Sequence, residues 1–139
     1  MNKSIRMGAY ALASLASLAS LAAFGAAGAV AADSYPHRPV TVLVPFGPGS
    51  GVDTTARIVG EALSRELGQP LVIENRAGAQ GAIAAQAAAR AAADGYTLFF
   101  TTQTTQAANP ALMKKPGYDP IKDFAPVGRV AYTPALLVA

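Results

Sequence analysis

The feature that most constrains this chain is a repeated order of segments in residues 39–101. A short apolar segment is followed by a turn and then by a segment with helical spacing. The apolar segments are rich in β-branched or aromatic residues and lie between turn-forming residues, which predicts buried strands. The predicted strands are 39–45, 70–74 and 96–101. Strands that alternate with helices form a parallel sheet with helices on its faces, so we expect an α/β fold.

Helices are predicted at 52–67 and 82–93, between these strands. The first has apolar residues on one face, at Val52, Ala56, Val59, Leu63 and Leu67. Asp53 falls in its first turn, where a carboxylate suits the helix dipole. Gly68 is predicted to end the helix as a left-handed cap. Further along, the pattern predicts a short helix near 109–113, a loop at 114–126, and strands at 127–132 and 135–139.

The carboxyl ends of the three predicted strands lead into loops that could bind a ligand. Ligands of parallel α/β sheets bind outside this end of the strands. The loops are a glycine-rich turn at 46–51, a second glycine-bearing loop at 75–81 and a threonine- and glutamine-rich segment at 101–106. Backbone amides beside a helix N-terminus attract an anion, and neutral side chains can hold a carboxylate without a buried cation. A tight turn beside a solvated loop would give the same pattern, and spacing alone leaves both interpretations open.

The first residues have the pattern of a secretory signal peptide. Lys3 and Arg6 precede an uncharged segment, 7–32, which contains the small-residue pattern Ala29-Val30-Ala31. We expect cleavage after Ala31, a signal peptide at 1–31 and a mature part at 32–139. A membrane anchor is the alternative, because the segment is long enough to span a bilayer. No positive residue follows it directly, however, which favours cleavage.

The charge and the cysteine content bear on the compartment and the partners of the mature part. Loss of Lys3 and Arg6 lowers the formal charge from +3 to +1, so the apparent basicity gives no reason to expect a nucleic-acid partner. The chain has no cysteine, which fits a bacterial periplasmic protein that does not depend on disulfides. The predicted strand at 135–139 has no turn or polar tail after it, and we expect a truncated chain on that ground.

Nucleotide binding and hydrolysis find little support. The Gly-x-Gly-x-Gly pattern at 47–51, with Glu74 ending the next strand, resembles a dinucleotide fingerprint. However, Val52 replaces the third glycine, and Asp53 would repel a pyrophosphate. Ser50 lacks the glycine frame of a hydrolase nucleophile, and His37 is the only histidine. We therefore predict no catalytic residue, metal or cofactor.

Six motifs in order give the chain a specific resemblance. They are Tyr35-Pro36-x-Arg38-Pro39-Val40, Val44-Pro45-Phe46-x-Pro48-Gly49-x-Gly51-x-Asp53, Glu74-Asn75-Arg76-x-Gly78-Ala79, Asp94-Gly95-Tyr96-Thr97-Leu98, Asn109-Pro110-x-Leu112 and Tyr118-Asp119-Pro120-x-x-Asp123-Phe124. With these motifs the mature part closely resembles the tripartite tricarboxylate transporter receptor family, the Bug-type periplasmic solute-binding proteins. Ser50, Ala77 and Gln80 depart from it, because the family commonly has glycine, proline and glycine there.

The resemblance implies a two-lobed, type II Venus-flytrap binding protein, of which residues 32–139 would be part of the N-terminal lobe. Such a receptor captures a small carboxylate or related metabolite for the membrane subunits of the tripartite transporter. The family binds its ligand largely through backbone amides and ordered waters. By resemblance the ligand-binding residues are Phe46, Gly49, Ser50, Gly51, Asp53, Gly78, Gly81, Thr102, Gln103, Thr104 and Thr105. The alternatives are an interaction module without a ligand pocket and, with less support, a secreted enzyme.

Overall fold

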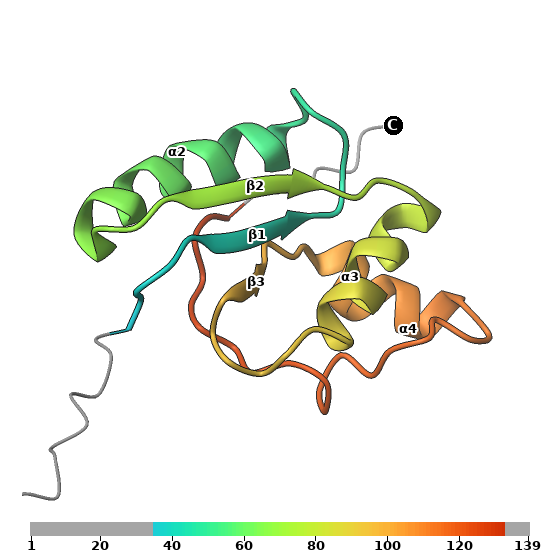
Figure 1. Ribbon diagram of the computed structural model, residues 1–139. Helices are drawn as coiled ribbons and strands as arrows, with labels where there is room; N and C mark the ends of the chain where they lie inside the picture. The colour runs from blue at the N-terminus through green and yellow to red at the C-terminus, as the bar shows by residue number, and fades with distance from the viewer. Residues whose placement is uncertain (1–34, 133–139) are drawn as a thin grey trace, which may run out of the picture. The chain divides into compact units, whose positions relative to one another are not determined.

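The computed structural model describes residues 35–132 (Figure 1). Within that range, strands β1 (Val40–Val44), β2 (Leu71–Asn75) and β3 (Thr97–Phe99) form one parallel sheet in the order β2-β1-β3. Val42 of the central strand lies opposite Ile73 on one side and Leu98 on the other. The sheet and its flanking helices confirm the predicted α/β class, and the strands predicted at 39–45, 70–74 and 96–101 are each found within two residues of their expected ends.

The central strand is the most buried part of the sheet. Val40 and Val44 are fully buried, and Val42 and Leu43 nearly so. β1 is paired on both sides and covered on both faces, and such strands are apolar throughout rather than alternating. Its valines also suit the pleated backbone, because a β-branched side chain packs well on that surface.

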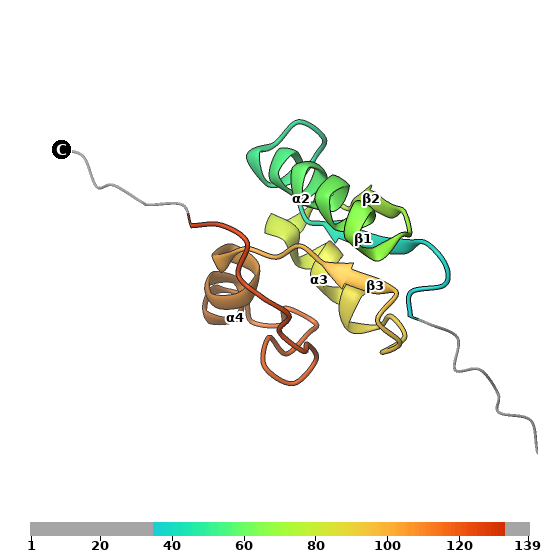
Figure 2. The same ribbon diagram turned by 90° about the vertical axis from the view of Figure 1, so that its left-hand side faces the viewer.

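Helix α2 (Gly51–Leu67) covers one face of the sheet, where it contacts β2 and β1 (Figures 1 and 2). It begins after Ser50, whose Oγ accepts a hydrogen bond from the Asp53 amide at 3.2 Å, and it ends at Gly68 with φ of 65°. The left-handed cap predicted at Gly68 is therefore confirmed. The predicted apolar face is only partly right: Ala56 is buried, but Leu63 is 39% exposed.

The opposite face is covered by helix α3 (Ala82–Ala89), which follows the short 3-10 turn η1 (Ala79–Gly81) and contacts β3 and β1 (Figure 2). Small side chains let α3 pack closely: Ala82 and Ala85 are buried together with Tyr118, and Phe99 of β3 packs against them. The helix predicted at 82–93 was too long, because it ends at Ala89. The chain has to turn before Asp94, which pairs with Arg38 at 3.0 Å beside the start of β1. Tertiary contacts thus override the helix propensity of Ala91–Ala93.

The polar loop predicted at 101–106 is wrong in its second half. The π-helical turn η2 (Thr104–Ala108) runs directly into helix α4 (Asn109–Leu112), where a short helix was expected. The Thr105 hydroxyl accepts a hydrogen bond from the Thr102 amide and donates one to the Thr102 carbonyl, which stabilises the start of this helical segment. Threonine has a low helix propensity, so this local pattern was not visible as a helix.

The segment after α4 has no helix or strand in its described part, up to residue 132. The strand predicted at 127–132 is wrong, because no strand pairs with it among the described residues; Val127 and Tyr132 are 90% and 81% exposed. The predictions for 1–31 and 135–139 lie outside the described residues. Between residues 35 and 132, no helix has the length and apolar character needed to cross a bilayer.

Candidate functional site

The loops that follow the three strands meet at the carboxyl edge of the sheet. Gly81 marks the meeting point: a Cβ atom there would lie 2.8 Å from Pro45 Cβ and 2.5 Å from Thr105 Cγ2. Only a residue without a side chain fits between these neighbours, and its φ of 87° also favours glycine. The Arg76 amide donates to the Val44 carbonyl at 2.8 Å, which joins the start of the second loop to the end of β1. The predicted convergence on one edge is therefore present.

The first loop places the start of α2 at this edge. Gly51 is exposed and Val52 is half-buried. Their amides lie in the first turn, where the helix itself offers no acceptor, and no hydrogen bond from either is found within residues 35–132. The positive end of the helix dipole adds to the attraction for an anion. Ser50 Oγ, by contrast, is already occupied as the helix cap.

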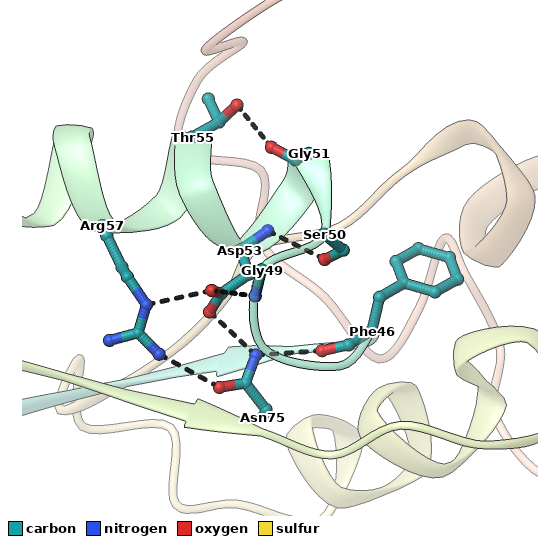
Figure 3. Close-up of polar contacts among 8 residues, drawn as sticks. All are labelled: Phe46, Gly49, Ser50, Gly51, Asp53, Thr55, Arg57 and Asn75. Atoms are coloured by element: carbon teal, nitrogen blue, oxygen red, sulfur yellow. Dashed lines mark hydrogen bonds and ion pairs between the residues drawn. The ribbon is translucent and has the colours of Figure 1, made fainter.

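Asp53 lies behind this loop, and only 2% of its surface is exposed. Its Oδ2 accepts hydrogen bonds from Arg57 Nε at 3.0 Å and from the Gly49 amide at 2.9 Å, while Oδ1 accepts one from Asn75 Nδ2 at 2.9 Å (Figure 3). These donors, Arg57 first, lower the pKa of Asp53 from 3.8 to about 2. Both carboxylate oxygens are used within the protein. We therefore assign Asp53 to the support of the loop rather than to ligand contact.

Arg57 and Asn75 complete the support of the first loop. The sequence analysis gave neither of them a role at the site, although Asn75 begins the predicted second loop. Asn75 Nδ2 also donates to the Phe46 carbonyl at 2.9 Å, and Arg57 Nη2 donates to Asn75 Oδ1 at 3.2 Å. The i,i+4 spacing of Asp53 and Arg57 on a helix is a signal that could have identified the ion pair. The half-buried Phe46 ring points away from this network (Figure 3).

The second loop has an unusual backbone. Four consecutive residues from Gly78 to Gly81 have positive φ, including Ala79 at 45° and Gln80 at 51°. Left-handed non-glycine residues cost free energy and persist only where the surroundings hold them. Asn109 does so here: it is 1% exposed, and its Nδ2 donates to the Gln80 carbonyl at 3.0 Å. Gly78 and Gly81 thus shape the loop.

The third loop divides into buried and accessible residues. Thr105 is fully buried, with its hydroxyl bonded to Thr101 and Thr102 and its carbonyl accepting from Tyr118 Oη. Thr105 therefore stabilises the edge through these buried hydrogen bonds. Gln103 is exposed and Thr104 half-buried, so both are accessible. Two polar atoms nearby, Thr102 Oγ1 and Gln106 Oε1, are buried without a hydrogen-bond partner in the described structure. Gln106 belongs to the polar segment 101–106 but is not among the ligand-binding residues expected by resemblance.

The edge combines neutral donors with one helix N-terminus. Within the described residues, no group of three or more histidine, cysteine, aspartate or glutamate side chains could hold a metal ion. His37 lies at the start of β1, at the opposite edge, where Nδ1 is 2.9 Å from Tyr96 Oη. Two open hollows of about 500 and 240 Å³ run along α2 and β2, and neither is lined by a residue of the three loops. The edge is therefore suited to bind a small anion on an open surface.

The chain is similar in sequence to a known family and to individual proteins. Residues 55–139 match the model of the family described as "Tripartite tricarboxylate transporter family receptor". BugT of Bordetella pertussis is 43% identical over 109 residues, which make up 78% of this chain and 33% of BugT.

Two solved structures of Rhodopseudomonas palustris proteins are also similar. MatC, solved with bound malate, is 46% identical with a TM-score of 0.67, over 69% of this chain and 33% of MatC. Rpa4515, solved with adipate, is 43% identical with a TM-score of 0.60, over 62% of this chain and 29% of that protein. The chain therefore spans about a third of the length of these relatives.

Proposed function

The chain belongs to the tripartite tricarboxylate transporter receptor family, and on this premise we propose that residues 35–132 supply one side of the ligand cleft of a periplasmic solute receptor. The observation that carries the proposal is the convergence of three strand-end loops on one edge, with the first-turn amides of α2 among them. A second lobe closing over this edge would bury the ligand and strengthen every polar contact to it.

The ligand class follows from the chemistry of the edge. Neutral hydroxyls, amides and a helix N-terminus suit a small carboxylate, and the similar proteins MatC and Rpa4515 were solved with malate and adipate. Of the residues expected to bind, we propose direct contact for Gly51, Gln103 and Thr104, which are exposed or half-buried. The Gly49 amide, Ser50 Oγ and the Thr102 amide are already bonded within the protein, so we propose that these residues hold the edge in shape. We propose that Phe46 borders the ligand. Asp53, Gly78, Gly81 and Thr105 shape the edge from within.

The proposal extends to the compartment and the partners. A signal peptide at 1–31 would deliver the receptor to the periplasm, where the family works, and it would be removed after Ala31. The membrane subunits of a tripartite transporter would then receive the ligand. In this role the protein is a binding protein and performs no catalysis.

The test is a nuclear magnetic resonance titration of the ¹⁵N-labelled chain with millimolar malate. We expect saturable shifts of the amide signals of Gly51, Val52 and residues 102–104, because these groups lie at the proposed site. Signals of Arg65 and Gly68, at the other end of α2, should stay in place. The diamide of malate, which lacks the negative charge, should cause no such shifts. Malate shifts absent from the edge, or spread evenly over the chain, would contradict the proposal.

A matched pair of glycine variants separates binding from stability. Gly49 and Gly68 both have positive φ, at 81° and 65°, and nothing lies within 4 Å of a Cβ atom at either position. Gly49→Ala and Gly68→Ala should therefore destabilise the fold by similar amounts, about 1 kcal/mol each. Only Gly49→Ala should abolish the malate shifts, because only Gly49 lies in the first loop. Loss of binding in both variants would point to a general effect of destabilisation and against the site.

A further inference from the structure

We propose that Asp53, Arg57 and Asn75 are positioning residues that set both the geometry and the charge of the anion-binding first loop. The inference rests on the proposed function of the edge and adds the means by which the loop is kept competent for an anion. None of the three contacts the ligand; they act through the backbone of residues 46–52.

The geometry is a three-way junction. The carboxylate of Asp53, on α2, accepts one hydrogen bond from the Gly49 amide of the loop. It accepts another from the side-chain amide of Asn75, the last residue of β2 (Figure 3). Asn75 holds the loop at a second point, the Phe46 carbonyl. The loop is thus tied at its start and its middle to two different elements. The junction uses the Gly49 amide and leaves the amides of Gly51 and Val52 at the edge.

The charge of the junction matters as much as its geometry. Asp53 is in the same helical turn as the Gly51 and Val52 amides, so an uncompensated carboxylate would repel a bound anion. Arg57 compensates it directly, at 3.0 Å. Other elements packed nearby add no charge to Asp53: β1 carries only valine, threonine and leucine, and Glu74 of β2 pairs with Arg76 at 2.7 Å. The site can therefore contain the Asp53 carboxylate and still attract the carboxylate of a ligand.

A matched pair of arginine variants tests the proposal. Arg57 and Arg65 lie on the same helix, and each pairs with an acid four residues earlier, at 3.0 Å for Asp53 and 3.8 Å for Glu61. We expect Arg57→Gln to weaken malate binding about tenfold, because it removes a charge-assisted hydrogen bond and exposes the anion to Asp53. Arg65→Gln, an exposed pair far from the edge, should change it by less than about twofold. Arg57→Lys keeps the positive charge but loses the second hydrogen bond, from Arg57 Nη2 to Asn75 Oδ1. Its affinity for malate should lie between those of the unmodified chain and Arg57→Gln.

A second measurement needs no ligand. The Gly49 amide signal reports the titration of Asp53, because that amide donates to the carboxylate. Its midpoint should lie near pH 2 in the unmodified chain and rise in Arg57→Gln, with no change in Arg65→Gln. If the unmodified chain does not bind malate, the proposed function is wrong. The pH titration of the Gly49 amide signal would still test whether Arg57 and Asn75 hold Asp53 in place. If malate binds but Arg57→Gln matches Arg65→Gln in affinity or in the Gly49 midpoint, the positioning role is wrong.

Discussion

At the scale of single residues, the structure separates accessible polar groups at the sheet edge from buried groups that hold the loops in place. Asp53 and Thr105 were both expected to bind the ligand by resemblance, yet both are buried with their side-chain oxygens occupied. Burial of a polar group without a partner costs free energy, and these buried oxygens are directed at partners within the protein rather than at the open edge. Sequence position alone places both residues beside strand-end loops but does not show which way their side chains face.

The buried carboxylate makes acid stability a test at this scale. The folded-state pKa of Asp53, about 2, lies below its ordinary value of 3.8, so its contribution is present above about pH 4 and is lost as the pH falls towards 2. We expect thermal unfolding temperatures of the unmodified chain to fall in this window more than those of Asp53→Asn. Asp119 also has a lowered pKa, but it is present in both proteins and cancels in the comparison. Equal losses in the two proteins would show that Asp53 is not stabilised by its partners.

At the scale of elements, the edge depends on contacts between segments far apart in sequence. The π-helical turn η2 places Thr105 against Gly81 and leads to Asn109, which holds the left-handed second loop. π-Helical turns are rare and frequently found at functional sites. Asn109 is 29 residues from Gln80, whose carbonyl it binds, so no local sequence pattern predicts the contact.

Removal of that contact should loosen the second loop. We expect Asn109→Ala to lower the free energy of unfolding by about 2 kcal/mol, because it leaves the Gln80 carbonyl without its donor in a strained turn. Leu112→Ala is the control on the same short helix, since Leu112 is 80% exposed and should cost less than about 0.5 kcal/mol. Urea unfolding of both variants measures the difference. Similar losses would mean that the Asn109 hydrogen bond does not hold the loop.

At the scale of the whole molecule, one side of a cleft is a weak binding site. Water competes with a ligand for backbone donors on an open edge, and under the proposed function closure of a second lobe would remove that competition. We therefore expect calorimetry of the 139-residue chain with malate to give millimolar affinity at best. Micromolar affinity would show that the edge described here is sufficient without a second lobe.

The sequence by itself determined the three strand–loop–helix units, the cap at Gly68 and the edge on which the loops meet, because periodicity and glycine turns are local signals. The tertiary structure decided the rest. It showed that 127–132 has no partner strand in the described part, that 104–108 is helical, and that Arg57 and Asn75 support the first loop. A strand needs a neighbour, and a buried polar group needs a partner. Both are supplied by residues distant in the chain, which a single sequence does not identify.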